Sequence, residues 1–163
     1  MVLSVSVLDH MFGLATIVHD AIDVASVHVD GFTRYALLDR GSYEVAPGPS
    51  LPELARVASD VTGRSLAVVE SRVLRLRAGD YLLAHHDSIY ADNPVEVVAD
   101  LSPSRVIGAE VHYRRRGQVF LRFPSQPGAV SVVERGPTVT CNHTYVSKLR
   151  PDALVIRLVA LLR

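Results

Sequence analysis

Short segments in which hydrophobic and polar residues alternate fill most of the chain. They are rich in Val, Leu and Tyr, and turn-forming sequences such as Ala-Gly-Asp, Ser-Pro-Ser and Pro-Ser-Gln-Pro-Gly separate them. Side chains on a strand alternate between two faces, so this pattern predicts β-strands. The predicted strands are residues 26–30, 33–38, 65–76, 80–86, 94–100, 106–113, 118–123, 129–134, 138–146 and 153–162.

One segment has the periodicity of a helix. Residues 51–63 follow Pro-Gly-Pro-Ser and end at Gly63, a common helix terminator, and they place five apolar side chains near one face: Leu51, Leu54, Ala55, Ala58 and Val61. The pattern of residues 2–22 is mixed, and a second helix could lie there. One or two helices and seven or eight short strands predict an antiparallel sandwich or barrel, with a jelly roll as the natural candidate.

Composition narrows the functional classes. A chain of 163 residues is expected to form a single domain, and its 17 basic and 17 acidic residues balance. That balance argues against a nucleic-acid binder or a polybasic membrane anchor. Cys141 is the only cysteine, so an internal disulfide is impossible and a reducing compartment is expected. The N-terminus lacks the basic region of a signal peptide, and we expect a soluble cytoplasmic protein.

The segment Arg-Leu-Arg-Ala-Gly-Asp-Tyr-Leu-Leu-Ala-His-His-Asp-Ser carries the clearest chemical signal. On a strand after the Ala-Gly-Asp turn, His85 and Asp87 point to the same side. An imidazole and a carboxylate so placed form two corners of a metal site. His143, on another predicted strand, can supply the third. Two histidines and one carboxylate leave three positions of an octahedral Fe(II) ion open for a cosubstrate and O2.

Arg157 interrupts Ala-Leu-Val-Ile-Arg-Leu-Val-Ala-Leu-Leu, an otherwise apolar strand that reads as core. A buried guanidinium is costly unless an anion meets it. A dicarboxylate cosubstrate is a suitable partner, because a carboxylate matches the planar fork of arginine.

At these residues the chain resembles the Fe(II)/2-oxoglutarate-dependent oxygenases, most closely the prolyl-4-hydroxylase-like branch. The resemblance covers roughly residues 65–163. The family pattern R-Y-x-x-G-D-x-x-x-x-H-x-D corresponds to Arg75 through Asp87. The later parts of the family pattern correspond, in order, to Val-Ala-Asp-Leu-Ser-Pro at 98–103, Arg-Gly-Gln-Val at 116–119, Gln-Pro-Gly-Ala-Val at 126–130, and His143 with Val146.

The resemblance implies a double-stranded β-helix, cupin-like in shape, over residues 65–163, with residues 1–64 as an N-terminal extension and supporting helix. It implies that His85, Asp87 and His143 hold Fe(II) and that Arg157 binds the far carboxylate of 2-oxoglutarate. An enzyme of this kind uses O2 and 2-oxoglutarate, releases CO2 and succinate, and oxidises a substrate, most often by hydroxylation.

The chain departs from the family at several positions. Leu76 stands where the family has a tyrosine that helps hold 2-oxoglutarate, and Tyr81 on the same strand could compensate. A Lys-Leu-Arg-Pro turn replaces the compact glycine turn between the distal histidine and the anchor, so Lys148 and Arg150 compete with Arg157 for that role.

Other interpretations of these residues remain open at this point. His28 and Asp30 repeat the His-x-Asp spacing without the approach strand, and His86 could replace His85 if the strand carries a bulge. His143 could be a core histidine, and Arg157 could pair with a buried acid. Cys141 shares the parity of His143 and could lie near the metal, although a small buried cysteine is the commoner case.

A chain this short has little room for a peptide-binding or nucleic-acid-binding subdomain, so we expect a small-molecule substrate such as an amino acid or a biosynthetic intermediate. The segment 32–45 is expected to cover the barrel mouth or add edge strands, and to contact that substrate. The apolar C-terminal strand could pair with a second copy in a homodimer. The alternatives are a cupin-type metal enzyme that takes no 2-oxoglutarate and a non-catalytic ligand-binding member of the fold.

Overall fold

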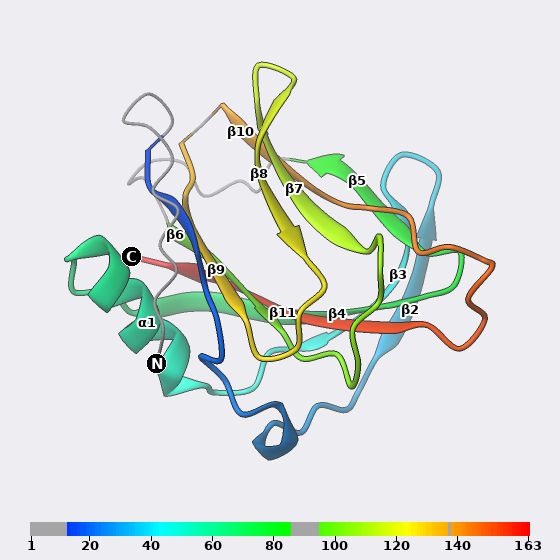
Figure 1. The fold of residues 1–163 in the computed structure, drawn as a ribbon, viewed down its shortest axis with the longest axis horizontal. Helices are drawn as coiled ribbons and strands as arrows, with labels where there is room; N and C mark the ends of the chain where they lie inside the picture. Colours follow the sequence, from blue (N-terminus) through cyan, green and yellow to red (C-terminus); the bar gives the residue numbers. More distant parts are fainter. Residues whose placement is uncertain (1–12, 86–94, 137) are drawn as a thin grey trace.

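In the computed structural model, which describes residues 13–85, 95–136 and 138–163, antiparallel strands curl into a nearly closed barrel with one helix against its outside (Figure 1). The helix α1 spans Pro52–Thr62, and a single 3-10 turn, η1, spans Val24–Ser26. The strands are β1 (Ala15–Val18), β2 (Thr33–Leu37), β3 (Gly41–Pro47), β4 (Val68–Arg77), β5 (Tyr81–His85), β6 (Val95–Asp100), β7 (Glu110–Arg115), β8 (Gln118–Pro124), β9 (Val130–Glu134), β10 (Val139–His143) and β11 (Leu154–Leu162).

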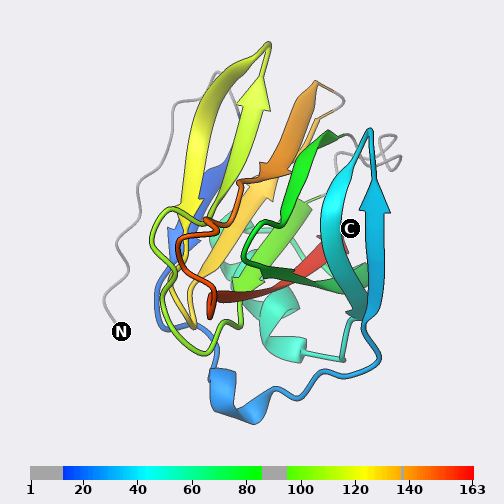
Figure 2. The same cartoon turned by 90° about the vertical axis from the view of Figure 1, so that its right-hand side faces the viewer.

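The strands form two facing layers that Figure 2 shows from the side. The larger layer has the order β1-β9-β6-β11-β4-β3, with β2 paired to β3, and the smaller layer has the order β5-β10-β7-β8. From β4 to β11 the chain passes back and forth between the layers, which is the connectivity of a double-stranded β-helix. The predicted fold class is therefore confirmed.

Strand β3 joins the two layers on one side of the barrel. Its residues 44–47 pair with β4, and its first two residues pair with β5. The crossing depends on Gly41, where φ is +141° and an added Cβ would lie 2.2 Å from the carbonyl oxygen of Tyr81. Any larger residue would push β3 away from β5, so the glycine permits the close approach. On the other side of the barrel, β1 and β8 approach each other.

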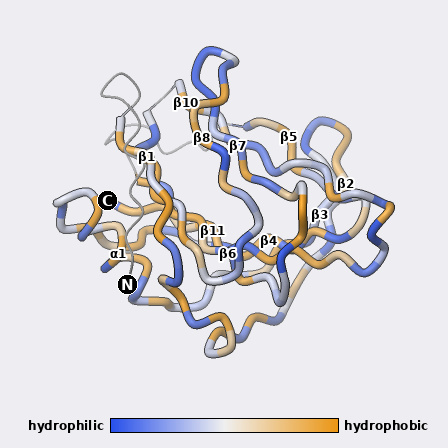
Figure 3. The backbone as a smooth tube through the Cα atoms, viewed as in Figure 1, coloured by the Kyte–Doolittle hydropathy of each residue, from blue (hydrophilic) through white to orange (hydrophobic). Residues whose placement is uncertain are grey.

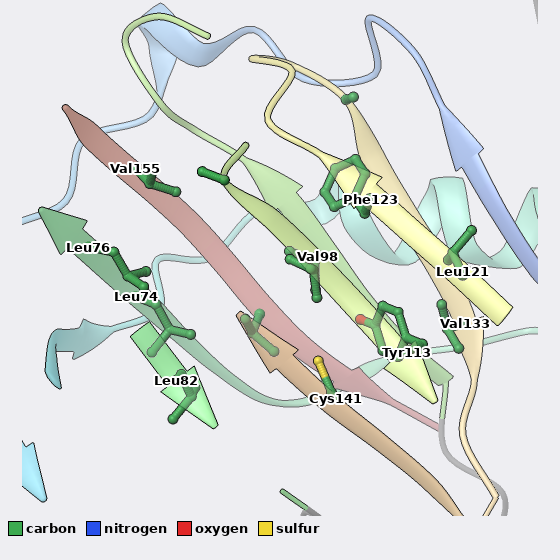
Figure 4. Packing of buried hydrophobic residues seen from close by; sticks show 14 of the residues in the cluster. Leu74, Leu76, Leu82, Val98, Tyr113, Leu121, Phe123, Val133, Cys141 and Val155 are labelled. Atoms are coloured by element: carbon green, nitrogen blue, oxygen red, sulfur yellow. The ribbon is translucent and has the colours of Figure 1, made fainter. Parts of the chain in front are cut away.

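The hydrophobic residues form two packed regions, one on each face of the larger layer. Strand β6 shows the division, since Val98 points into the barrel while Val95 and Val97 point outward toward α1. Figure 4 shows the inner region, where Leu74, Leu76, Val98, Tyr113, Leu121, Phe123 and Cys141 meet between the layers. Helix α1 closes the outer region with its buried residues Leu54, Val57 and Ala58.

Most of the predicted elements are confirmed. The helix at 51–63 is α1, and the predicted strands from residue 33 onward correspond to β2 and β4 to β11. The prediction of a strand at 26–30 is wrong. The chain there leaves η1, whose start is fixed by Asp23 accepting a hydrogen bond from the N–H of Ala25, and no strand pairs with it. Of the stretch that could have held a second helix, residues 15–18 form β1.

The surface contrasts with this interior. The arginine-rich turn between β7 and β8 projects from the barrel as a hydrophilic loop (Figure 3). In the described ranges, no helix combines the length and the hydropathy that crossing a membrane requires.

The β2–β3 hairpin is fastened to the turn between β4 and β5 by a buried carboxylate. Asp80 accepts hydrogen bonds from Arg34 Nη1 (2.7 Å), from the N–H of Arg77 (2.8 Å) and from Ser42 Oγ (3.0 Å). Burial alone would raise the pKa of Asp80, but these hydrogen bonds and the charge of Arg34 outweigh it, so the pKa lies below its usual range. The hairpin therefore has a fixed place beside β5.

We predict that Asp80→Asn lowers the free energy of unfolding by roughly 1–2 kcal/mol at pH 7, since charged hydrogen bonds are lost but Arg34 is half exposed to solvent. A depressed folded-state pKa stabilises the fold above the unfolded-state value near ~4, and this contribution is lost as the pH falls through the folded-state value. The difference in free energy of unfolding between wild type and Asp80→Asn should thus become smaller below about pH 4. Urea unfolding between pH 7 and pH 3 measures it, with the exposed Asp152→Asn as control. A pH-independent gap would contradict the assignment.

Candidate metal and cosubstrate site

His85 is the last residue of β5, and its side chain faces the barrel interior. Its Cα partner across the β5–β10 ladder is Cys141, which is buried in the inner core. The Nδ1 atom lies 3.0 Å from the carbonyl oxygen of Leu83. A neutral ring in this position donates from Nδ1–H and keeps its lone pair on Nε2, the form in which imidazole binds a metal.

His143 is the last residue of β10, and only 3% of its surface is exposed. It pairs with Leu82 on β5 and Val111 on β7, across an irregularity in the β5–β10 ladder. It therefore lies two positions along β10 from the residue opposite His85, or about 7 Å along the strand. Burial, and then the charges of Arg157, His85 and Arg72, hold the pKa of His143 well below its usual range. The ring is neutral at physiological pH, as a metal ligand must be.

Arg157 is the largest fully buried side chain, with 1% of its surface exposed. Its Nη1 lies 3.2 Å from Nδ1 of His143, and its Nη2 donates to the carbonyl oxygen of Ala109 at 2.8 Å. Its Nε has no hydrogen-bond partner among the residues that the structure describes. Burial lowers the pKa of Arg157, although the negative charge of Asp100 opposes that effect. No carboxylate in the described part of the chain lies within ion-pair distance of this guanidinium.

Asp100 is the carboxylate whose charge most strongly offsets the burial of Arg157, and its oxygens are already engaged. They accept hydrogen bonds from the N–H groups of Ser102 (2.9 Å) and Gln126 (2.5 Å), which hold the loops at the end of β6. Asp100 and Arg157 are Cα partners across β6 and β11. The acid therefore supports the loops and leaves the guanidinium to neutral acceptors.

The contact between Arg157 and His143 has a chemical consequence. A guanidinium only donates, so Nδ1 of His143 accepts, and the neutral ring then carries its proton on Nε2. A metal ion at Nε2 needs the opposite tautomer. The two residues can thus fill their expected roles together only when Arg157 turns from His143 to another acceptor.

The remaining predicted residues are distributed as follows. Asp87 and His86 lie outside the described residues. Tyr81 lines a groove together with Leu82, Leu83, His143 and Tyr145, and Arg157 is not among the residues that line it. Lys148 and Arg150 are exposed in the loop after β10. The His28–Asp30 pair is a surface pair, with side chains 90% and 88% exposed.

A buried polar network that the sequence did not reveal crosses the interior behind His85. Glu96 on β6 accepts hydrogen bonds from Tyr113 Oη at 2.7 Å and from Arg135 Nη1. Nη2 of the same arginine donates to the carbonyl oxygens of Val139 (3.1 Å) and His85 (3.3 Å). All three network side chains are buried. The network therefore ties the end of β5 and the start of β10 to the larger layer.

A cavity of about 220 Å³ opens beside His85 between β3, β4 and β5. Its floor is formed by Leu74 and Leu82, and Leu74 is the Cα partner of Arg157 across β4 and β11. The full lining is Tyr35, Arg40, Tyr43, Val45, Arg72, Leu74, Leu82 and His85. The site thus combines two buried or half-buried histidines, a guanidinium without a carboxylate, and an adjoining space for a small molecule.

No family model and no curated protein sequence matches the chain. Several solved structures share its fold. An oxidoreductase of the 2OG-Fe(II) oxygenase family from Burkholderia pseudomallei is 15% identical with a TM-score of 0.63, covering 91% of this chain and 84% of that one. The alpha-ketoglutarate-dependent epimerase SnoN from nogalamycin biosynthesis is 16% identical with a TM-score of 0.68, covering 93% and 78%. A prolyl-4-hydroxylase from Pseudomonas putida is 12% identical with a TM-score of 0.61, covering 93% and 92%. The predicted resemblance is thus confirmed at the level of the fold.

We predict that Glu96→Gln lowers the free energy of unfolding by about 3–5 kcal/mol, because it leaves the Arg135 charge buried without its carboxylate. Tyr113→Phe should lower the free energy of unfolding by only about 1 kcal/mol, since it removes one hydrogen bond to Glu96 and leaves the ion pair intact. Urea unfolding measures both, with the exposed Glu70→Gln as control. Equal effects of Glu96→Gln and Glu70→Gln would show that the ion pair does not hold the two layers together.

Proposed function

We propose that the chain is a non-haem Fe(II), 2-oxoglutarate-dependent oxygenase that oxidises a small molecule. His85, Asp87 and His143 would hold the iron, and Arg157 would bind the far carboxylate of 2-oxoglutarate. The observation that carries the proposal is the fully buried guanidinium of Arg157, which lies beside a neutral histidine and has no carboxylate partner among the described residues.

The burial of Arg157 calls for an anion. Removing a charged group from water costs several kcal/mol, roughly, unless an opposite charge and well-placed hydrogen bonds replace the lost hydration. Here two neutral acceptors meet Nη1 and Nη2, and Nε meets none. A carboxylate accepting from two of these nitrogens would supply the missing charge. Lys148 and Arg150, the competing anchors, are exposed to water and carry no such deficit.

The donor set fits a divalent iron. His85 presents the tautomer that a metal ligand needs, and His143 is neutral because of its burial. An incoming carboxylate would draw Arg157 away from Nδ1 of His143, and that release permits the ring to carry its lone pair on Nε2. Binding of cosubstrate and binding of metal would therefore support each other.

Iron bound with 2-oxoglutarate would supply the activation of O2 that oxidises the substrate. The residues of this chain position the reactants for that chemistry. Arg157 orients the cosubstrate by its far end, and Arg135 holds the backbone of His85 in place. Leu74 and Leu82 line the cavity together with His85, and their apolar side chains would disfavour water there. A cavity of about 220 Å³ suits a small molecule, for which hydroxylation is the expected outcome.

One observation favours a second candidate, a cupin-type metal enzyme that takes no 2-oxoglutarate. The contact of Arg157 with His143 and Ala109 is also what a purely structural arginine would make. In that case Arg157 would keep a structural role through the carbonyl oxygen of Ala109, and only its contact with Nδ1 of His143 would be given up when a metal binds Nε2.

The two candidates differ in an anaerobic titration of metal-free protein with Fe(II) and then 2-oxoglutarate, followed by the visible charge-transfer band of a chelated 2-oxo acid. We predict a band that requires both additions. It should disappear in His85→Ala and in His143→Ala, because iron no longer binds. If iron binds but no charge-transfer band appears, whichever of the two is added first, the result would favour the cupin-type enzyme.

Arg157→Ala should not weaken iron binding, because the variant frees Nδ1 of His143. It should raise the 2-oxoglutarate concentration for half-saturation by about 100-fold, since a bidentate charged contact is lost. Arg150→Ala is the matched control and should change it less than about twofold, because an exposed arginine outside the barrel makes no such contact. Unchanged 2-oxoglutarate affinity in Arg157→Ala would move the anchor to Lys148 or Arg150.

A further inference from the structure

The cavity beside His85 has one wall that the eight strands of the barrel do not provide. Strands β2 and β3 supply Tyr35, Tyr43 and Val45 to its lining, and the turn between them supplies Arg40. Figure 2 shows this hairpin standing next to β5, at the side of the barrel where β3 links the two layers.

The hairpin is held in place before any ligand arrives. Arg34 and Ser42 bind the buried carboxylate of Asp80, and the N–H of Leu83 on β5 donates to the carbonyl oxygen of Arg40 at 2.7 Å. On the outer face, Glu44 accepts from Nε of Arg75 at 2.7 Å. A wall fixed at both its base and its turn loses little conformational entropy on binding.

One face of the hairpin carries aromatic and aliphatic side chains that are partly exposed to solvent. Tyr35 and Tyr43 are Cα partners, and their rings stack with centroids 6.0 Å apart and an interplanar angle of 25°. Leu37 lies on the same face as Tyr35 by strand alternation. Tyr35 is 43% exposed and Leu37 is 44% exposed, while Val45 at the inner end packs against the barrel core. The apolar face thus runs from the core to open solvent along the cavity, as a ligand-binding wall does.

The charged side chains among the described residues that line the cavity are basic. Arg40 and Arg72 line it, and none of its eight lining residues is acidic. The Arg40 side chain makes no hydrogen bond or ion pair with any described residue. It stands in the turn between β2 and β3, at the outer end of the aromatic face, where its five N–H donors can reach an anion.

We propose that this cavity binds the oxidisable substrate and that the substrate is a small, flat acid, an aromatic or otherwise unsaturated carboxylic acid. Its planar part lies along Tyr35 and Tyr43, its carboxylate meets Arg40, and the atom to be oxidised points toward His85. The assignment rests on the proposed oxygenase function. Aromatic stacking and a bidentate arginine contact are the two interactions that the wall offers.

The test uses benzoate as the probe on full-length, metal-free protein without 2-oxoglutarate, with binding measured by ligand-observed NMR titration. Benzamide lacks the charge, and cyclohexanecarboxylate lacks the flat ring. We expect benzoate to bind at least about tenfold more tightly than either, because each control loses one of the two interactions. Benzamide binding as tightly as benzoate, or no benzoate binding at all, would overturn the proposal.

Two variants test whether benzoate binds in this cavity. Arg40→Gln and Tyr35→Ala should each weaken benzoate binding about tenfold, whereas their controls Arg150→Gln and Tyr145→Ala, exposed residues elsewhere, should leave it unchanged. Because Arg40 and Tyr35 are exposed, the variants should unfold at the wild-type temperature. Equal losses in test and control variants, or benzoate binding that Arg40→Gln does not affect, would sink the idea. So would a wild-type dimer that Tyr35→Ala dissolves, since the face would then join two copies.

The outcomes separate this inference from the function on which it rests. If the iron and 2-oxoglutarate band forms but benzoate does not bind in the cavity, the oxygenase stands and the substrate class is wrong. If benzoate binds as expected and no band forms, the cavity is a binding site for flat acids and the oxygenase function fails.

Discussion

The ion pair between Glu96 and Arg135 ties the two layers of the barrel together at the point where the candidate site begins. Glu96 belongs to the larger layer, and through Arg135 it reaches the carbonyl oxygens of His85 and Val139, at the adjoining ends of two strands of the smaller layer. A buried ion pair contributes little net stability compared with apolar packing, but it tolerates little displacement, because each misplaced polar group loses its partner. The position of the His85 backbone therefore depends on this network, and with it the geometry of any metal that His85 binds.

Arg157 is the informative contrast, because the same barrel buries a second guanidinium under different conditions. Arg135 has a carboxylate, two carbonyl groups and a place in a network, whereas Arg157 has one imidazole, one carbonyl group and an Nε without a partner. Asp100 lies opposite Arg157 across the β6–β11 ladder, but its carboxylate accepts hydrogen bonds from loop N–H groups instead. Among the described residues, Arg135 thus meets a carboxylate and Arg157 does not. A buried charge without a counter-charge favours the binding of an anion at the expense of the empty state, which is why the proposed function rests on Arg157.

The sequence could predict the eight strands of the barrel because each alternates strongly and is bounded by turns. It singled out His85 by its spacing from Asp87, His143 as a third ligand from another strand, and Arg157 as an interruption of an apolar strand, and the functional roles of these residues stay predictions. It could not predict β3, since Gly41 and Pro47 at its ends are typical of loops and the partners of its polar residues Ser42 and Glu44 lie on other elements. The segment at 26–30 misled in the opposite sense, because Val27 and Val29 alternate like a strand but pack as a loop against the outer core. The Glu96–Arg135 pair joins residues 39 positions apart. No local sequence pattern predicts this contact, because it arises from the register between β6 and β9.

The insertion of β3 between β4 and β5 has a consequence for how the two halves of the site depend on each other. His85, His143 and Arg157 lie on strands of the barrel, and the Glu96–Arg135 network holds the backbone of His85. The aromatic wall belongs to a hairpin whose strand β3 pairs with β4 and β5 and whose other contacts include Asp80 and the N–H of Leu83. Substitutions on the exposed face of β2 leave the barrel ladders intact, because β2 pairs with β3 alone. In the proposed oxygenase, chemistry and substrate choice would therefore rest on separable parts of the chain. A change of Tyr35 or Arg40 would alter which molecule approaches His85 without moving His85 itself.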